Sequence, residues 1–182
     1  MAFTKKKQLL FTAGAVLLGA LLISSCSSTN APLETVPSVD LDRYMGKWYE
    51  IASIPQRFSK GCQCTTAEYK LNAEEGYVEV YNSCLKEGKV SDVNGKAFPV
   101  EGSNNSKLKV QFFWPFKGDY WILELDPDYR YVMVGSPDRE SLWFLSRTPT
   151  MDDATYARLE QLANTKGFPV EQLQMMEHDC ED

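Results

Sequence analysis

The side chains with the greatest capacity for chemistry in this 182-residue sequence are five cysteines and a single histidine. A Ser-His-Asp arrangement needs a histidine held in place by its neighbours, and His178 lies in an acidic segment, HDCED, near the end of the chain. Cys62 and Cys64 are one residue apart, which is not the Cys-x-x-Cys spacing of a redox centre. The sequence therefore predicts no enzyme active site, no cofactor and no metal, and a zinc site is the less favoured alternative to disulfides.

Cys26 follows a segment that is typical of an export signal. Lys5, Lys6 and Lys7 precede an uncharged apolar stretch over 9–23, which is shorter than the about 20 residues of a membrane-spanning helix. Small residues directly before a cysteine resemble the bacterial lipoprotein cleavage site. The resemblance implies that 1–25 is a signal peptide and that Cys26 carries lipid, with an ordinary signal peptide as the alternative. Ser27, where lipoproteins of the inner membrane carry Asp, favours the periplasmic face of the outer membrane.

The charge distribution excludes one class of partner. Residues 26–38 are polar, contain two prolines and are expected to form a lipidated tether before a domain over 39–182. Loss of 1–25 removes three lysines and no acid, so the formal net charge falls from −6 to −9. No basic cluster follows the signal, and we expect no nucleic-acid partner.

The remaining sequence must supply the elements that position any site, and it alternates like a β-protein. Short apolar–polar segments are separated by turn residues at near-regular spacing, which is typical of an antiparallel sandwich or an up-and-down barrel. A helix is expected to begin near Thr150, followed by a short ninth strand over 172–176. The eight preceding strands are predicted over 48–54, 65–71, 77–81, 89–100, 107–114, 120–125, 130–134 and 142–146.

Three motifs resemble those of the lipocalin family. Gly46-x-Trp48 matches the first, Asp128-Tyr129 matches most of the second, with Pro127 where Thr is usual, and Arg147 matches the third. The runs GKWYEIA, LDPDYRYVMVG and SPDRESLWFLSRTPT look especially like bacterial outer-membrane lipocalins. The resemblance implies an all-β fold, an eight-stranded antiparallel up-and-down barrel with one C-terminal α-helix and a short ninth strand.

Tracing this barrel places the family motifs at one end. Successive links alternate between the two ends, so Gly46, Trp48, Asp128, Tyr129 and Arg147 should meet at a closed floor, with Arg147 stacked on the Trp48 ring. We interpret these five residues as structural. The opposite end is then the mouth.

The predicted ligand site is the barrel interior and its rim. Strand alternation and apolarity assign Leu108, Val110, Phe112, Tyr131, Met133, Trp143 and Leu145 to the lumen, and the mouth links carry Phe58, Trp114 and Phe116. Such a wall suits an acyl chain, since each buried CH₂ contributes about 0.8 kcal/mol. A solid core, and local packing between the links, are the alternatives.

Four cysteines remain after the signal, and an even number in an exported protein indicates disulfides. In the barrel layout Cys62 enters the second strand and Cys84 leaves the third at the mouth end of one hairpin. We expect the pairs Cys62–Cys84 and Cys64–Cys180, the second like links to the C-terminal tail that occur in lipocalins.

The expected function is that of a non-enzymatic container. It would bind, store or transport a fatty acid, lysophospholipid or similar ligand for membrane maintenance, and would contact the membrane through lipid on Cys26. One alternative is a lipid isomerase that uses a free Cys64 thiol, and another is a structural envelope protein with a filled barrel. The lipid, its direction of transfer and the oligomeric state are left open.

Overall fold

The computed structural model describes residue 1 and residues 32–180, and the chain divides into two units, 1–30 and 31–182. The expected signal peptide, the lipidation site Cys26 and the first part of the tether lie outside the described residues. Among the residues that are described, no helix is long and apolar enough to cross a membrane. The following account concerns the second unit.

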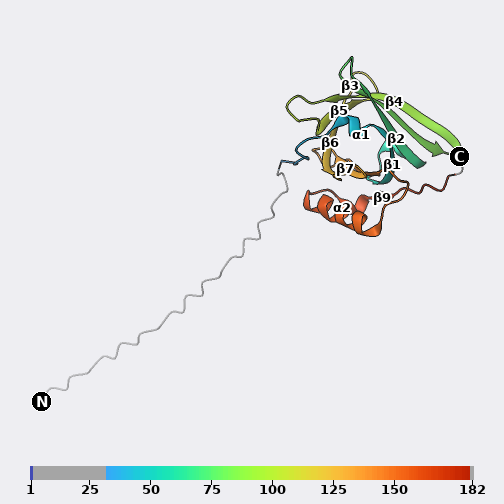
Figure 1. Ribbon diagram of the computed structural model, residues 1–182. Helices are drawn as coiled ribbons and strands as arrows, with labels where there is room; N and C mark the ends of the chain where they lie inside the picture. The colour runs from blue at the N-terminus through green and yellow to red at the C-terminus, as the bar shows by residue number, and fades with distance from the viewer. Residues whose placement is uncertain (2–31, 181–182) are drawn as a thin grey trace. The chain divides into compact units, whose positions relative to one another are not determined.

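Eight antiparallel strands close into a barrel, as the sequence predicts, and a ninth short strand adds to its edge. The sheet follows the order β2-β3-β4-β5-β6-β7-β8-β1-β9, and β1 also pairs with β2, which closes the ring around α1 (Figure 1). The strands are β1 (Gly46–Ser53), β2 (Cys62–Asn72), β3 (Tyr77–Lys86), β4 (Lys89–Pro99), β5 (Lys107–Gln111), β6 (Gly118–Leu125), β7 (Tyr131–Gly135), β8 (Leu142–Ser146) and β9 (Gln174–Met175).

Links alternate between two ends of the barrel, as the sequence predicts. We call the end with the links 73–76, 100–106 and 126–130 the closed end. We call the other end, with the links 54–61, 87–88, 112–117 and 136–141, the mouth end. The link 54–61 contains the short 3-10 helix η1 (Arg57–Ser59), and a second one, η2 (Val170–Gln172), precedes β9.

Two helices cover different parts of the barrel. The single turn α1 (Leu41–Tyr44) is capped by the Asp40 carboxylate and places Tyr44 inside the ring. The helix α2 (Asp153–Thr165) packs on the outer wall, and its N-cap is Asp152 rather than Thr150, because the Asp152 carboxylate accepts a hydrogen bond from the Thr155 amide at 2.9 Å. The chain ends α2 with Gly167 at φ +85°, a conformation that glycine adopts without strain.

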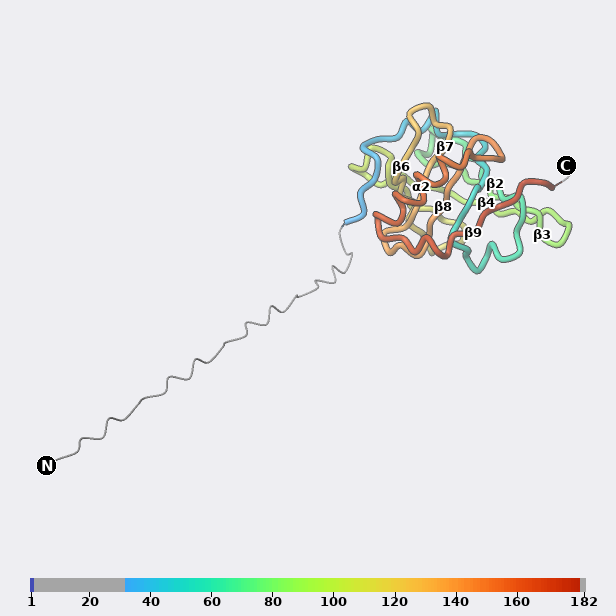
Figure 2. The backbone as a smooth tube through the Cα atoms, turned by 90° about the horizontal axis from the view of Figure 1, so that it is seen from below, coloured from blue at the N-terminus to red at the C-terminus, as the bar shows by residue number. Residues whose placement is uncertain are grey.

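The apolar residues form two cores that share the barrel wall. One fills the closed half of the lumen around Trp48, Ile122 and Val132, which are fully buried. The other lies between the outer wall and α2, around Phe144 and Leu159. Figure 2 shows the second core's helix, α2, alongside β8 on the outside of the barrel. Some strands therefore bury both faces.

Candidate functional site

The closed end is fixed by Arg147, whose guanidinium lies over the Trp48 ring with 3.8 Å from Cζ to the ring centroid. Arg147 donates to the carbonyls of Lys47 at 2.9 Å, Arg43 at 2.8 Å and Tyr44 at 3.1 Å. One side chain thus connects the end of β8 to α1 and to the start of β1. Burial lowers the pKa of Arg147, but the group keeps its charge since guanidinium titrates far above neutral pH.

The other family-motif residues surround Arg147 at the same end. The Tyr129 carbonyl accepts from Arg147 Nε at 3.3 Å, and its hydroxyl accepts from the Asp40 amide at 2.9 Å. Gly46 has φ +91°, and an added Cβ there would lie 3.5 Å from Arg147 Nη1. The five expected closed-end residues are thus gathered at one end, and Trp48, Tyr129 and Arg147 make the contacts that join its segments.

Asp128 is present at this end but does little with its side chain. Its carboxylate is exposed, whereas the Asp126 carboxylate is buried and accepts hydrogen bonds from the Asp128 amide and from Arg130 Nε and Nη2. Bonds from Arg130 hold the pKa of Asp126 below its usual range. Asp126 therefore organises the turn.

Five of the seven residues expected in the lumen face it. Leu108 and Leu145 belong to the lumen core and are buried, while Val110, Phe112 and Trp143 pack against that core and are partly buried. The residues between them on β5 face outward, as alternation requires, because Lys109 pairs with Asp119 at 2.7 Å and Lys107 lies over the Trp121 ring.

The assignment of Tyr131 and Met133 to the lumen is wrong. Both belong to the outer core beneath α2, and Met133 is fully buried there. Val132 and Val134 face the lumen instead. The physical reason is that α2 covers the outer face of β7, so both faces of this strand are apolar and apolarity carries no information about direction.

Burial inside the barrel decreases from the closed end toward the mouth. Near the closed end Trp48 is 0% exposed and Ala97 is 1% exposed, but Phe112 and Trp143, nearer the mouth, are only partly buried. A cavity of about 10 Å³ remains among Tyr44, Tyr69 and Tyr120 and their apolar neighbours, which is the space of one water molecule at most. The accessible apolar surface inside the barrel is therefore at Phe112 and Trp143.

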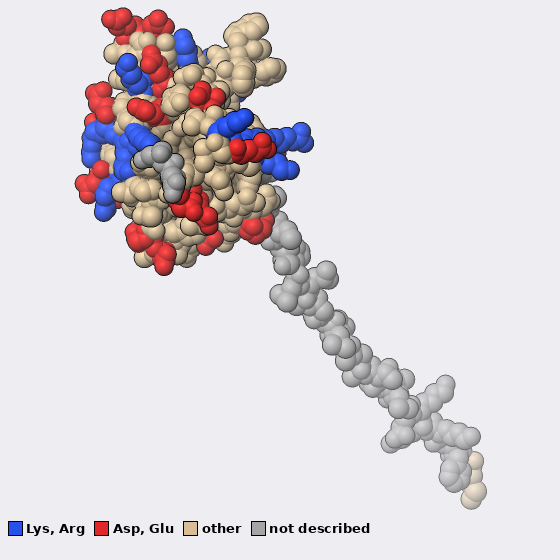
Figure 3. Space-filling view, turned by 90° about the vertical axis from the view of Figure 1, so that its right-hand side faces the viewer, with Lys and Arg blue, Asp and Glu red and all other residues tan. Residues whose placement is uncertain are grey.

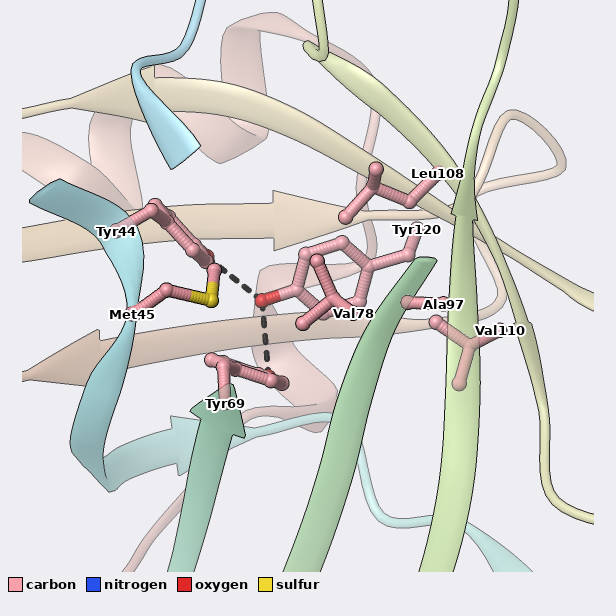
Figure 4. Close-up of a pocket in the computed structure, with 8 residues that line it drawn as sticks. All are labelled: Tyr44, Met45, Tyr69, Val78, Ala97, Leu108, Val110 and Tyr120. Atoms are coloured by element: carbon pink, nitrogen blue, oxygen red, sulfur yellow. Dashed lines mark hydrogen bonds between the residues drawn. The ribbon is translucent and has the colours of Figure 1, made fainter. Parts of the chain in front are cut away.

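Three tyrosines form the boundary between the two halves. The hydroxyl of Tyr120 lies 2.7 Å from that of Tyr44 and 3.1 Å from that of Tyr69 (Figure 4). Burial raises the pKa of all three hydroxyls well above the usual tyrosine value, so they stay protonated at neutral pH. We call these residues the tyrosine cluster. The sequence did not predict it, because no spacing in the sequence connects Tyr44 of α1 with Tyr69 of β2 and Tyr120 of β6.

One carboxyl group is buried in the barrel wall. Glu50 is 6% exposed, shares the inward direction of Trp48 on β1, and accepts a hydrogen bond from Ser53 Oγ at 2.6 Å. Burial raises the pKa of Glu50, and this carboxyl is close enough to Tyr69 to affect its pKa as well. Glu50 is two residues after Trp48 in the same strand, and this spacing would have predicted that its side chain faces the lumen.

The rim residues expected from the sequence are exposed. Phe58 lies in the link 54–61, while Trp114 and Phe116 lie in the link 112–117, and each keeps more than two thirds of its surface accessible. Phe113 and Val90, which the sequence analysis did not single out, are exposed at the same end. No polar neighbour covers this apolar surface within the described part of the chain.

Both disulfides join the cysteines expected from the sequence. Cys62 is bonded to Cys84, and Cys64 is bonded to Cys180 across 116 residues of sequence. The second bond holds the C-terminal tail against the barrel, where His178 Nε2 lies 2.7 Å from the Glu50 carbonyl oxygen. Cys64 has no free thiol, which removes the basis for the isomerase alternative.

The geometry defines a class of protein: a small up-and-down antiparallel barrel that is closed at one end by α1 and by the residues around Arg147. A family model described as a lipocalin-like domain matches residues 39–178. The chain belongs to the lipocalin family.

Relatives of known name fall in several kingdoms. Temperature-induced lipocalin-1 of Arabidopsis thaliana is 40% identical over 150 residues, which are 78% of this chain and 80% of that protein. The outer membrane lipoprotein Blc of Escherichia coli K12 is 38% identical over 160 residues, 86% of this chain and 90% of that protein. The outer membrane lipoprotein Blc of Vibrio cholerae is 35% identical over 161 residues, which are 87% of this chain and 94% of that protein.

Among solved structures, insecticyanin from the tobacco hornworm superposes with a TM-score of 0.65 over 81% of this chain and 85% of that protein. At 21% identity this similarity concerns the fold alone.

Proposed function

We propose that this lipocalin binds the acyl chain of a fatty acid, lysophospholipid or similar amphiphile in the mouth half of its barrel. The observation that supports this most directly is the gradient of burial in the lumen. Phe112 and Trp143 face inward near the mouth yet keep accessible surface, whereas Trp48, Val78 and Ala97 in the lumen core are at most 1% exposed. An acyl chain would cover that surface, with about 25 cal/mol gained for each Å² removed from water.

Small residues line one part of the lumen wall. Ala67 and Ala97 are small, and the space in front of Gly95 is filled by the Phe112 ring, which would lie 2.7 Å from an added Cβ. In this proposal the Phe112 ring turns aside when an acyl chain enters. Below them the tyrosine cluster closes the lumen and limits how deep the chain reaches. Binding is passive in this proposal: capture at the mouth, burial of the chain and release near a membrane.

The proposed location is the periplasmic face of the bacterial outer membrane, through lipid on Cys26. Supporting this are the apolar stretch, the small residues before Cys26 and the relatives named outer membrane lipoproteins. Mass spectrometry of the processed N-terminus tests it directly. A mature protein that begins upstream or downstream of Cys26, without acyl mass, contradicts the anchor but not the ligand site.

Two matched tryptophan variants test the ligand site. Trp143 faces the lumen, whereas Trp121 faces outward beneath Lys107. Titration with a fluorescent fatty acid should give at least a tenfold weaker Kd for Trp143→Ala, a loss of about 1.4 kcal/mol, and an unchanged Kd for Trp121→Ala. Equal affinities in two folded variants contradict the proposed site. A wild-type protein that binds no fatty acid or lysophospholipid favours the structural envelope protein with a filled barrel.

A further inference from the structure

The large apolar side chains that this protein exposes are concentrated at the mouth. Eight such residues are exposed among those described, and five of them lie in or next to three mouth-end links. These are Phe58 at 74%, Val90 at 71%, Phe113 at 70%, Trp114 at 86% and Phe116 at 77% exposure. We call them the mouth rim. Scattered exposed apolar residues are ordinary, but a group of this size at one end of a molecule indicates an interaction surface.

The same three links are basic in an otherwise acidic domain. With the flanking Lys86 and Lys89, the links 54–61, 87–88 and 112–117 contain five basic residues and one acid, a net charge of +4, and the fourth mouth-end link, 136–141, carries −1. The basic residues are Arg57, Lys60, Lys86, Lys89 and Lys117, and all five are exposed. Counted in the same way, with one flanking residue on each side, the closed-end links 73–76, 100–106 and 126–130 carry a net charge of −3.

Most of these mouth cations have no partner among the residues that the structure describes. Arg57, Lys60, Lys86 and Lys89 make no side-chain hydrogen bond or ion pair with any described residue, while Lys117 Nζ lies over the Phe98 ring at 4.1 Å. On the face that Figure 3 displays, basic and acidic side chains are interspersed. The difference in charge described above is a difference between the links of the two ends. Aromatic rings beside unpaired cations are typical of surfaces that bind the interface of an anionic bilayer.

The path of the chain before the barrel leads to the same end. The Glu34 carbonyl accepts a hydrogen bond from Lys166 at 3.2 Å, and the Lys166 carbonyl accepts from Arg139, which lies in the mouth-end link 136–141. From there the chain runs along β6 to the closed end, where the Val39 amide donates to the Asn104 carbonyl (Figure 2). The described chain therefore starts on the mouth side of the barrel.

The length of the preceding segment restricts where the barrel sits. Cys26 is six residues before Pro32, and six residues span at most about 20 Å. A lipid on Cys26 holds the start of the barrel's approach segment within that distance of the bilayer. The segment between Cys26 and Pro32 is long enough for the mouth end to contact the membrane. For the closed end to contact it, the same segment would have to extend along the whole barrel wall.

From these observations we infer that the mouth rim is a docking surface for an anionic phospholipid bilayer, with the barrel opening facing the lipid. The aromatic side chains enter the interface and the surrounding cations contact headgroup phosphates. The tether argument rests on the lipid anchor of the proposed function, while the rim and its charge do not depend on it. In this orientation an acyl chain passes between bilayer and lumen without crossing water.

Quenching of tryptophan fluorescence by brominated lipid tests the orientation. The processed protein, purified from membranes, is reconstituted in vesicles of brominated phosphatidylcholine with or without phosphatidylglycerol. Quenching on the anionic vesicles should fall by more than half in Trp114→Phe and stay at the wild-type level in Trp121→Phe. Quenching that survives Trp114→Phe overturns the inference.

A third tryptophan separates docking from ligand uptake. If Trp143→Phe alone removes the quenching, brominated lipid enters the barrel while the rim stays in water, so the proposed function stands and the docking surface is refuted. If Trp114→Phe alone removes it, docking is supported and uptake is what fails.

The electrostatic part has its own matched control. Lys60→Gln and Lys89→Gln should each lower the ratio of docked to free barrels about fivefold on vesicles with phosphatidylglycerol and leave it unchanged on phosphatidylcholine alone. Lys70→Gln, an exposed residue on the barrel wall, should change neither. Equal effects of Lys60→Gln and Lys70→Gln contradict an anionic bilayer as the partner.

Discussion

Replacing Arg147 by lysine should destabilise the barrel without weakening ligand binding. The substitution keeps a positive charge near the Trp48 ring but replaces a planar group with a single ammonium. The guanidinium reaches carbonyls of three segments at once, those of α1, Lys47 and Tyr129. A lysine at this position would satisfy one of these segments and leave the others to water.

The magnitude follows from the contacts. Arg147 donates four hydrogen bonds, and about three are lost; each is worth roughly 1 kcal/mol net at this partly exposed site. The stacking on Trp48 at 3.8 Å weakens rather than disappears. Together these effects predict a loss of about 3 kcal/mol in the free energy of unfolding, measured by urea titration with far-UV circular dichroism.

Arg158→Lys is the matched control. Arg158 also donates two hydrogen bonds, to Glu124 at 3.0 Å and to Tyr131 at 2.9 Å, but on the exposed face of α2. Its replacement should cost less than about 1 kcal/mol. An Arg147→Lys protein within 1 kcal/mol of wild type, or one whose folded form binds fatty acid tenfold more weakly, would refute the view that the family motifs hold the floor and do not contact ligand.

Two further changes act on other parts of the barrel. Burial raises the pKa of Glu50 above its ordinary 4.5, so the stability this group contributes is complete below that value and is lost as pH rises through the raised pKa. The stability of Glu50→Gln relative to wild type should therefore increase from pH 4 to pH 8, and a pH-independent difference in urea unfolding contradicts the assignment. Replacing both Cys64 and Cys180 by serine should cost about 3 kcal/mol and increase hydrogen exchange in β9, with fatty-acid affinity retained; unchanged exchange in β9 would show that the tail is held by other contacts.

The lumen could be predicted from sequence only where a strand has one polar face. In β5 the sequence Lys-Leu-Lys-Val-Gln alternates, so Leu108 and Val110 were assigned correctly. In β7 the sequence Tyr-Val-Met-Val-Gly is apolar throughout, and its direction is set by α2, which the local pattern does not contain. The strand order and the closed-end motifs needed no such tertiary information.

Features that depend on packing between segments far apart in the chain could not be predicted from the sequence. The tyrosine cluster joins α1, β2 and β6, and no spacing links these residues. The mouth-side start of the described chain likewise depends on where residues 33–39 pack along β6 and α2. The whole-domain charge also hid a basic mouth, because the acidic closed end cancels it in the sum.

The two sides of the mouth differ in how firmly they are held, and this bears on where a ligand enters. The link 54–61 is tied to the link 136–141, since Gln56 Nε2 donates to the Glu140 carbonyl at 3.2 Å. Among the described residues, the link 112–117 makes no hydrogen bond to another mouth-end link; its internal bond runs from the Phe116 amide to the Phe113 carbonyl. Under the proposed function, we therefore expect an acyl chain to enter between this link and the β3–β4 turn, because displacement of the link would break no hydrogen bond to another described mouth-end link.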